Sequence, residues 1–558
     1  MSDLSQAQPQ AQSQSEIRAA MKAPFGAGTG HPAERPGARK HGHSSGQEIA
    51  LTPMQQGRLY ESAAAGRPWV NLEQIVVHLD AEAPDPRALR VAWQQVCARH
   101  PVLRSAVLWQ GRPLPVLQVA GVDAAADQVR VETQDWQGLE AEEQAARLEQ
   151  FLTEDRNRGC ALEQAVSWRV MLARLGPNRS VMVWTIHHVL VDGRSMAVVL
   201  EDVFAALIGG ELPAATAPVT GFDAFSPAVA QVSEQPASQA FFRAHLEGFD
   251  TPNQIARLTG PDDRPVVAAP DDADHGRKQI LRRQLPAELR RALMQRAAQV
   301  TVADETLPET SGAQGAGAAT LANMIHAAWG LLVARWSGRE MAVFGVTRSG
   351  RYLLEGCGRT VGCLINTVPL HLHLSGSTTV DGLLAALRRD AVALRPHEQA
   401  SLADMRRWCG LPGSVPLFDT MVMFERDSLN MRMRSLGVEE DSPWQHRRVE
   451  LREEGAMPLT LAVYGDAQPL VMLEYDPEVL PASQVERMLD HLCQLLQSLA
   501  TAPADMALRD LGMLPEAEAT QLLQQGRPDP ALAQVLAREM AAAPPCMATR
   551  LEATAARM

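Results

Sequence analysis

The stretch VMVWTIHHVLVDG, from Val181 to Gly193, decides the fold class of this 558-residue chain. A run of apolar and β-branched residues leads into the pair His187 and His188, which predicts a strand running into the histidines. Successive side chains of a strand point to opposite faces, so the two imidazoles cannot both enter one pocket. We therefore expect one histidine to carry chemistry and the other to support it.

Asp192 and Gly193 fall where this strand gives way to a predicted helix from Ser195 to Leu207. We expect Gly193 to permit a tight turn, whose backbone amides, close to a helix N-terminus, are suitable donors for a developing oxyanion. A neutral imidazole beside them can accept a proton from an amine or hydroxyl while a carbonyl is attacked. The other interpretation is a hydrogen-bonded core histidine, with Asp192 as a helix cap.

Composition limits the classes of function. The hydrophobic fraction of 46% is ordinary for a globular protein, and no apolar run approaches the roughly 20 residues that cross a bilayer. The formal net charge of -13 opposes nucleic acid as the main partner. The seven cysteines lack a C-x-x-C pair, and adjacent histidines are a poor chelate, so we predict reduced thiols and no metal site. The N-terminus has no secretory signal, and a cytoplasmic location is expected.

Polarity and apolar periodicity divide the chain into four segments. Residues 1–47, rich in Ala, Gln, Ser, Gly and Pro, are predicted to be a disordered tail. Alternating strand and helix patterns over 48–225 and 226–515 predict two lobes of an α/β protein, separated near a polar, proline-rich passage. Residues 301–318 are expected to form a surface loop within the second lobe. The end of the chain, 516–558, is predicted to be a peripheral helix or a partly disordered tail.

The motif HHxxxDG at a strand-to-helix junction is typical of the chloramphenicol-acetyltransferase-like superfamily, and its surroundings resemble condensation domains of nonribosomal peptide synthetases. Five further segments carry this resemblance. Leu51–Tyr60 (LTPMQQGRLY) is similar to the opening segment of the family, and Arg99–Arg104 (RHPVLR) to its RHExLR motif, with Pro in place of Glu. Val361–Thr367 (VGCLINT) is similar to VGxxxNT, and His397–Gln399 and Pro416–Phe418 stand where closing motifs are expected.

The resemblance covers roughly residues 50 to 515 and implies two chloramphenicol-acetyltransferase-like lobes forming a V-shaped pseudodimer, with a tunnel between them. In the family the second histidine of the motif is catalytic, which implies this role for His188. The motif aspartate is structural and pairs with an arginine. This implies a pair between Asp192 and Arg99, with Arg104 as the rival.

The resemblance suggests roles for the remaining site candidates. His187 is expected to support the site, and Gly193 to serve catalysis through the turn. Asn366 would lie in the second lobe facing the tunnel, or have a structural role at a strand end. Arg194 stands where the family often has Trp, and either places a basic group near a tunnel mouth or is solvated or capping. Ser195, at the start of the helix, is a further tunnel candidate.

The function implied is that of a freestanding condensation enzyme. It would transfer an acyl, peptidyl or polyketide chain from the phosphopantetheine thioester of a carrier protein, acting in trans, to an amine or hydroxyl acceptor. That acceptor is a small molecule or carrier-bound, the product is an amide or ester, and no cofactor is bound by the chain itself. The alternatives are a noncatalytic recruitment module, a coenzyme-A-dependent acyltransferase and an epimerisation domain, whose EGHGRE motif Glu355–Arg359 resembles superficially.

Overall fold

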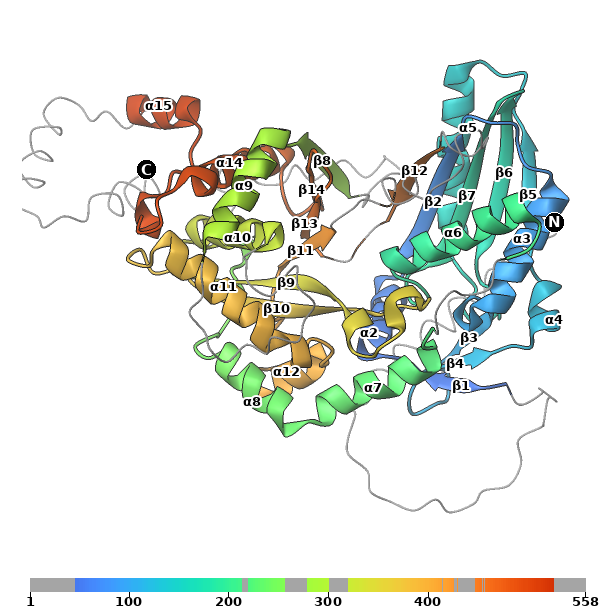
Figure 1. The fold of residues 1–558 in the computed structure, drawn as a ribbon, viewed down its shortest axis with the longest axis horizontal. Helices are drawn as coiled ribbons and strands as arrows, with labels where there is room; N and C mark the ends of the chain where they lie inside the picture. The colour runs from blue at the N-terminus through green and yellow to red at the C-terminus, as the bar shows by residue number, and fades with distance from the viewer. Residues whose placement is uncertain are drawn as a thin grey trace, which may run out of the picture.

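The computed structural model describes residues 46–212, 219–255, 278–300, 320–413, 415–425, 429 and 447–525, apart from positions 454 and 456. The described elements form two lobes that lie side by side, each built around its own β-sheet (Figure 1). The mixture of strands and helices confirms the predicted α/β class. Most of the tail 1–47, the insertion 301–318 and residues 526–558 lie outside the described residues, so those expectations stay predictions.

The first lobe is organised by a five-stranded sheet in the order β12-β2-β7-β6-β5. All neighbours in this sheet are antiparallel except β5 and β6. Its strands are β2 (Leu72–Leu79), β5 (Val131–Asp135), β6 (Arg169–Gly176), β7 (Arg179–His187) and β12 (Arg447–Arg452). The helices of this lobe are α2 (Pro53–Ala65), α3 (Pro86–Arg99), α4 (Val122–Ala126), α5 (Ala141–Arg158) and α6 (Gly193–Gly209). A small sheet joins β1 (Glu48–Ala50), β4 (Val116–Val119) and β3 (Ser105–Leu108).

Strand β7 is apolar on both faces because both faces are covered. Trp184 and Ile186 pack into a core that contains residues of α3 and α6, whereas Val181 and Val183 pack into a smaller core with a residue of α5. This confirms the strand predicted from the sequence, and the cover on both faces is a finding of the structure. The strand ends at His187, and the chain then passes through a short turn into α6.

The second lobe is built on a six-stranded sheet in the order β10-β9-β11-β13-β14-β8. Residues of α9, α10 and α14 share one hydrophobic core with this sheet. The strands are β8 (Gln279–Gln284), β9 (Met341–Ser349), β10 (Ile365–His373), β11 (Thr420–Glu425), β13 (Leu459–Tyr464) and β14 (Leu470–Tyr475). The helices that follow the first lobe are α7 (Phe222–Glu234), α8 (Pro236–His245), α9 (Ala287–Gln299), α10 (Leu321–Ser337), α11 (Val380–Leu394), α12 (Leu402–Trp408), α14 (Ala482–Thr501) and α15 (Glu516–Gln525). None of the described helices is long and apolar enough to span a bilayer.

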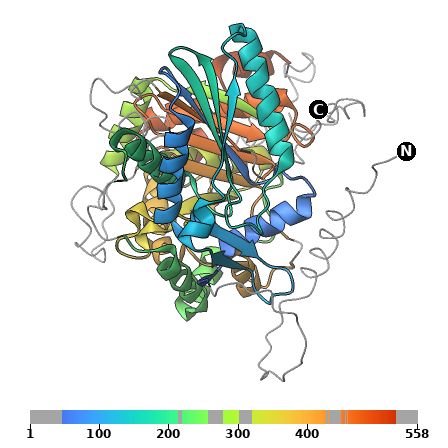
Figure 2. The ribbon, with the colours of Figure 1, turned by 90° about the vertical axis from the view of Figure 1, so that its right-hand side faces the viewer.

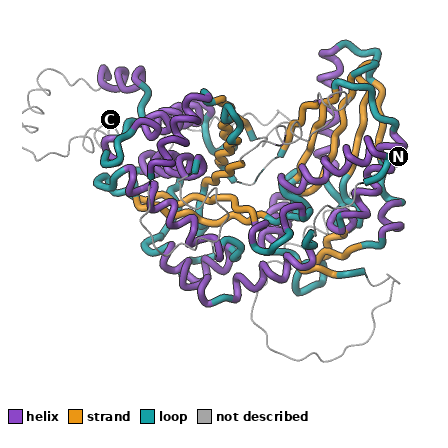
Figure 3. The backbone as a smooth tube through the Cα atoms, viewed as in Figure 1, coloured by secondary structure: helices purple, strands orange, loops and turns teal. Residues whose placement is uncertain are grey.

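Strand β12 joins the two lobes. It belongs by sequence to the second half of the chain, but it forms the edge of the first-lobe sheet, where Val449 pairs with Val77 of β2 (Figure 1). Val449 is buried in the first-lobe core, and Leu451 packs against that core. Seen after a 90° turn, the first lobe stands in front of the second (Figure 2), and the two sheets remain distinct in the backbone trace (Figure 3). The end of β12 therefore lies close to the junction of the lobes.

Candidate active site

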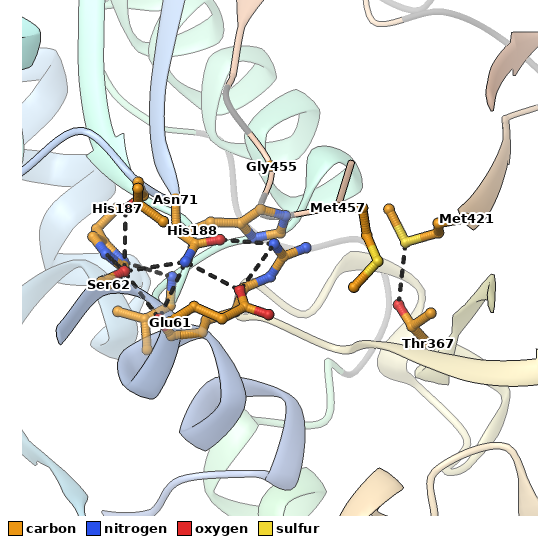
Figure 4. A network of polar contacts seen from close by, with 12 residues as sticks. Glu61, Ser62, Asn71, His187, His188, Thr367, Met421, Gly455 and Met457 are labelled. Atoms are coloured by element: carbon orange, nitrogen blue, oxygen red, sulfur yellow. Dashed lines mark hydrogen bonds and ion pairs between the residues drawn. The ribbon is translucent and has the colours of Figure 1, made fainter. Parts of the chain in front are cut away.

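His187 is fixed in one orientation at the end of β7. Its Nδ1 accepts a hydrogen bond from the backbone N–H of Val189 at 3.0 Å, and its Nε2 lies 3.0 Å from Oγ of Ser62 (Figure 4). Because Nδ1 is an acceptor, the neutral ring carries its proton on Nε2 and donates it to Ser62. Burial lowers the pKa of His187 to about 3, with a further contribution from the neighbouring His188. His187 is thus a neutral imidazole with both ring nitrogens hydrogen-bonded.

His188 follows the strand and lies near a buried carboxyl group of the same lobe. Its backbone N–H donates to the carbonyl of Asn71 at 2.8 Å, and its Nε2 lies 3.7 Å from Oε1 of Glu73. The residue is 8% exposed, and its Nδ1 has no hydrogen-bond partner of good geometry among the described groups. Burial, with the charge of Arg58, lowers the pKa of His188 to about 4. A neutral imidazole with unused nitrogen is able to accept a proton.

Asp192 is a buried structural anchor. It is the N-cap of α6, and its Oδ1 accepts the backbone N–H of Ser195 at 2.8 Å. Arg351 donates to both carboxylate oxygens, and the backbone N–H of Leu364 adds a bond of 2.9 Å. Burial alone would raise the pKa of Asp192, but the charge and hydrogen bonds of Arg351 outweigh it and lower the pKa. The aspartate therefore ties the first turn of α6 to the second half of the chain.

The predicted pairing of Asp192 with Arg99, or with its rival Arg104, was wrong. Arg99 lies 3.4 Å from the carboxylate of Asp202, and Arg104 donates to the carbonyl of Ala120 at 2.6 Å. Both stay within the first lobe. The partner of Asp192 is Arg351, 159 positions along the chain, and no sequence spacing identifies a contact of that kind.

The residues after Asp192 connect α6 with the segment that precedes β10. The hydroxyl of Ser195 donates to the carbonyl of Gly362 at 2.7 Å and accepts from the backbone N–H of the same residue. Ser195 is completely buried and is not a surface for substrate. Arg194 donates through Nε to the carbonyl of Gly358 at 3.2 Å. Its role here is a contact with a neighbouring loop.

Gly193 is the first residue of α6, and its φ is not positive. The neighbouring atom at this position belongs to the second lobe. A Cβ on Gly193 would lie 3.5 Å from Oε1 of Glu425, which is ordinary van der Waals contact. Glu425 ends β11, so the start of α6 faces the sheet of the second lobe.

Asn366 has a structural role in the second lobe. Its side-chain N–H groups donate to the carbonyls of Glu398 and Ala400, at 2.9 and 2.8 Å. These contacts fix the segment around His397–Gln399 against β10. Of the two interpretations offered by the sequence, the structure supports the strand-end role.

A set of carboxyl groups near His188 was not found by the sequence motifs. Glu73 lies on β2 and Glu453 directly follows β12, and burial raises the pKa of both groups. Burial and the surrounding carboxyls also raise the pKa of Tyr464, on the second-lobe sheet. A glutamate inside the apolar strand LEQIVVHL is the one signal in the sequence that points to this cluster.

The second-lobe sheet turns one face away from its own core. On β11, β13 and β14 the core residues include Val422, Leu461 and Leu473, so the alternating residues point the other way. Met421 belongs to that other face and lies 3.7 Å, Sδ to Oγ1, from Thr367. Figure 4 shows Met457 between this pair and His188.

Among the described residues, no group of three or more His, Cys, Asp or Glu is arranged to hold a metal ion.

Comparison with known proteins defines the class of this chain. The family model described as "Condensation domain" matches residues 45–523. The chain therefore belongs to the condensation domain family.

Curated relatives are long proteins that the chain matches over a small part of their length. It is 30% identical over 482 residues to a linear gramicidin synthase of Brevibacillus parabrevis, covering 85% of the chain and 6% of that protein. It is 30% identical over 464 residues to chondramide synthase cmdD of Chondromyces crocatus, covering 81% of the chain and 11% of that protein. The chain thus spans only a small part of the length of these relatives.

Solved structures show the same fold. The starter condensation domain of rhizomide synthetase RzmA, a mutant in complex with C8-CoA, has a TM-score of 0.64 at 18% identity, covering 84% of this chain and 98% of that one. The first condensation domain of the calcium-dependent antibiotic synthetase has a TM-score of 0.63 at 20% identity, covering 85% of this chain and 100% of that one.

Proposed function

We propose that the chain is a condensation enzyme of natural-product biosynthesis. It transfers an acyl, peptidyl or polyketide chain from the phosphopantetheine thioester of a carrier protein to an amine or hydroxyl acceptor. The observation that carries this proposal is the buried, neutral His188 beside Glu73, at the junction of the two lobes. Membership of the condensation domain family supports the same reaction class.

In the proposed reaction His188 accepts the proton of the acceptor N–H or O–H while that atom attacks the thioester carbonyl. The tetrahedral oxyanion forms near the first turn of α6, where the backbone N–H of Gly193 is a suitable donor. The C–S bond then breaks, the carbonyl re-forms, and the departing thiolate takes the proton from His188. His187 and the Asp192–Arg351 pair act by holding the turn in place. The carrier supplies the phosphopantetheine, and the chain itself needs no bound cofactor.

We further propose that the lobes form a V-shaped pseudodimer with a tunnel that passes His188. The strand β12 at the edge of the first-lobe sheet, and Glu425 close to Gly193, support a site built from both lobes. A carrier arm enters from one end of the tunnel and the acceptor from the other. Residues of both lobes then contribute to substrate binding.

The test is product formation from a carrier protein loaded with an acyl chain, using a panel of amines and alcohols. Intact-mass measurement detects a new covalent product and the freed phosphopantetheine thiol. In deuterated buffer the same assay separates condensation from epimerisation, which exchanges the donor α-hydrogen without forming a new bond. The absence of product with every donor and acceptor, together with unchanged carrier, would refute the proposal and favour a noncatalytic recruitment role.

A further inference from the structure

Two carboxyl groups lie close together beside His188: Glu73 on β2 is buried, and Glu453, directly after β12, is partly exposed. The register of β12 against β2 pairs Arg452 with Gln74, and its continuation by one residue brings Glu453 opposite Glu73. Glu73 is 1% exposed, and its Oε2 has no hydrogen-bond partner among the described groups. Like charges directly opposite each other destabilise a sheet. The pair is therefore unfavourable when both groups are ionised, and a hydrogen bond with Glu453 contributes to the raised pKa of Glu73.

The basic side chains nearby have other contacts. Lys278 lies 3.2 Å from Oε1 of Glu474 and also donates to a backbone carbonyl. Arg58 favours the ionised form of both opposed carboxyls through space, but its Nη1 donates to Oδ1 of Asn71 at 2.7 Å. Despite Arg58, burial still raises the pKa of both carboxyls. Without a ligand, the pair therefore tends to retain a proton, which a bound cation would release.

The facing surface suits a flexible apolar chain. Met421 lies on the second-lobe sheet, and Figure 4 shows Met457 between it and His188. Thioether side chains adapt to unbranched methylene groups of varied length. From His188 towards the second-lobe sheet, the labelled side chains of Figure 4 thus change from polar groups to two thioethers, an order that suits a cationic head on an aliphatic stem.

We propose that Glu73 and Glu453 form a binding site for the ammonium group of an aliphatic amine, which is the acceptor of this enzyme. The inference rests on the proposed function and selects an amine over a hydroxyl acceptor. The ammonium R–NH₃⁺ gives one proton to the carboxylate of Glu73, and the neutral amine then attacks the thioester carbonyl. The new C–N bond replaces the C–S bond, His188 carries the second amine proton to the leaving thiolate, and Glu73 returns its proton to solvent.

Calorimetry of the full chain without any carrier tests the site, using n-butylammonium and its uncharged counterpart n-butanol. Loss of a hydrogen bond to a charged group weakens binding by about tenfold or more. We therefore expect n-butylammonium to bind at least tenfold more tightly than n-butanol, and Glu453→Gln to remove most of this difference. Glu73→Gln is the second site variant. Glu450→Gln, on β12 and already paired with Arg448 and Arg452, is the matched control and should bind like the unaltered chain.

Two outcomes overturn the inference: n-butanol binding as tightly as n-butylammonium, or n-butylammonium binding equally well to Glu453→Gln. Failure of both compounds to bind also overturns it. A carrier assay keeps the two proposals apart. An ester formed from n-butanol as readily as an amide from n-butylamine would support the proposed function and reject the ammonium site. Selective ammonium binding without product from any acceptor would leave the site standing and reject the condensation activity.

Discussion

Arg351 donates two hydrogen bonds to the carboxylate of Asp192, from Nη1 to Oδ2 at 2.8 Å and from Nη2 to Oδ1 at 2.9 Å. Both side chains are buried, with exposed fractions of 4% and 0%. The pair joins the first turn of α6 to a segment from the second half of the chain. Together with the bonds of Ser195 to Gly362 and of Leu364 to Asp192, it holds the histidine turn in register with the second half of the chain.

Replacing Arg351 with Met is expected to lower the free energy of unfolding by about 3–5 kcal/mol, because it leaves a buried carboxylate without its counter-charge. Urea denaturation measures the loss. Arg99→Met is the control, since Arg99 is more exposed and its contact with Asp202 should contribute about 1 kcal/mol or less. Equal losses in the two variants would contradict the structural role given to Arg351.

Replacing Ser62 with Ala is expected to destabilise the chain by about 1–3 kcal/mol, because the Nε2–H of His187 then loses its acceptor inside the protein. Thermal or urea unfolding measures this. Ser377→Ala, at an exposed position, should change stability by about 0.5 kcal/mol or less. Nitrogen chemical shifts of His187 give an independent check: a proton on Nδ1 instead of Nε2 would disprove the assigned tautomer.

The imidazole of His188 is expected to stay neutral until the pH falls to about 4. An unperturbed histidine is protonated near pH 6.5, so between these values the unfolded chain binds the extra proton and the folded chain does not. The contribution of His188 to stability is therefore lost as the pH falls, by about 1.4 kcal/mol per unit over this window. NMR titration of labelled histidine, assigned with His188→Ala, measures the pKa. A midpoint near 6.5 would show that the ring is not desolvated.

Val449→Ala on the joining strand β12 is expected to cost about 1–2 kcal/mol, because this side chain is buried in the first-lobe core. Val392→Ala, at an exposed position of α11, is the matched control and should stay within about 0.5 kcal/mol. Urea unfolding compares them. If both substitutions are equally mild, β12 does not pack on the first lobe as described.

The sequence predicted those features that depend on local pattern. The apolar run before His187 predicted the strand, and Asp192 at the start of α6 was expected as a cap or scaffold. Contacts between distant segments had no such signal. Nothing in the spacing of Arg99 and Arg351 tells which reaches Asp192, since the answer depends on how the two lobes pack.

The acidic pair shows the same limit. Glu73 stands out as a charge within an apolar strand, but its neighbour Glu453 reaches it only because β12 crosses to the other lobe. Strand pairing between residues so far apart in sequence is a tertiary property. The motif residues alone therefore indicated a histidine centre without its surrounding carboxyls.

The most direct test of the central claim is the rate of product formation by His188→Ala from a carrier loaded with an acyl chain, at saturating acceptor. A positioned general base contributes about 10²–10⁴-fold, so the variant should lose at least about a hundredfold in rate while still binding the carrier. His78→Ala, a partly exposed histidine of β2, is the control and should react at the unaltered rate. Product formation by His188→Ala at the rate of the His78→Ala control would contradict the account.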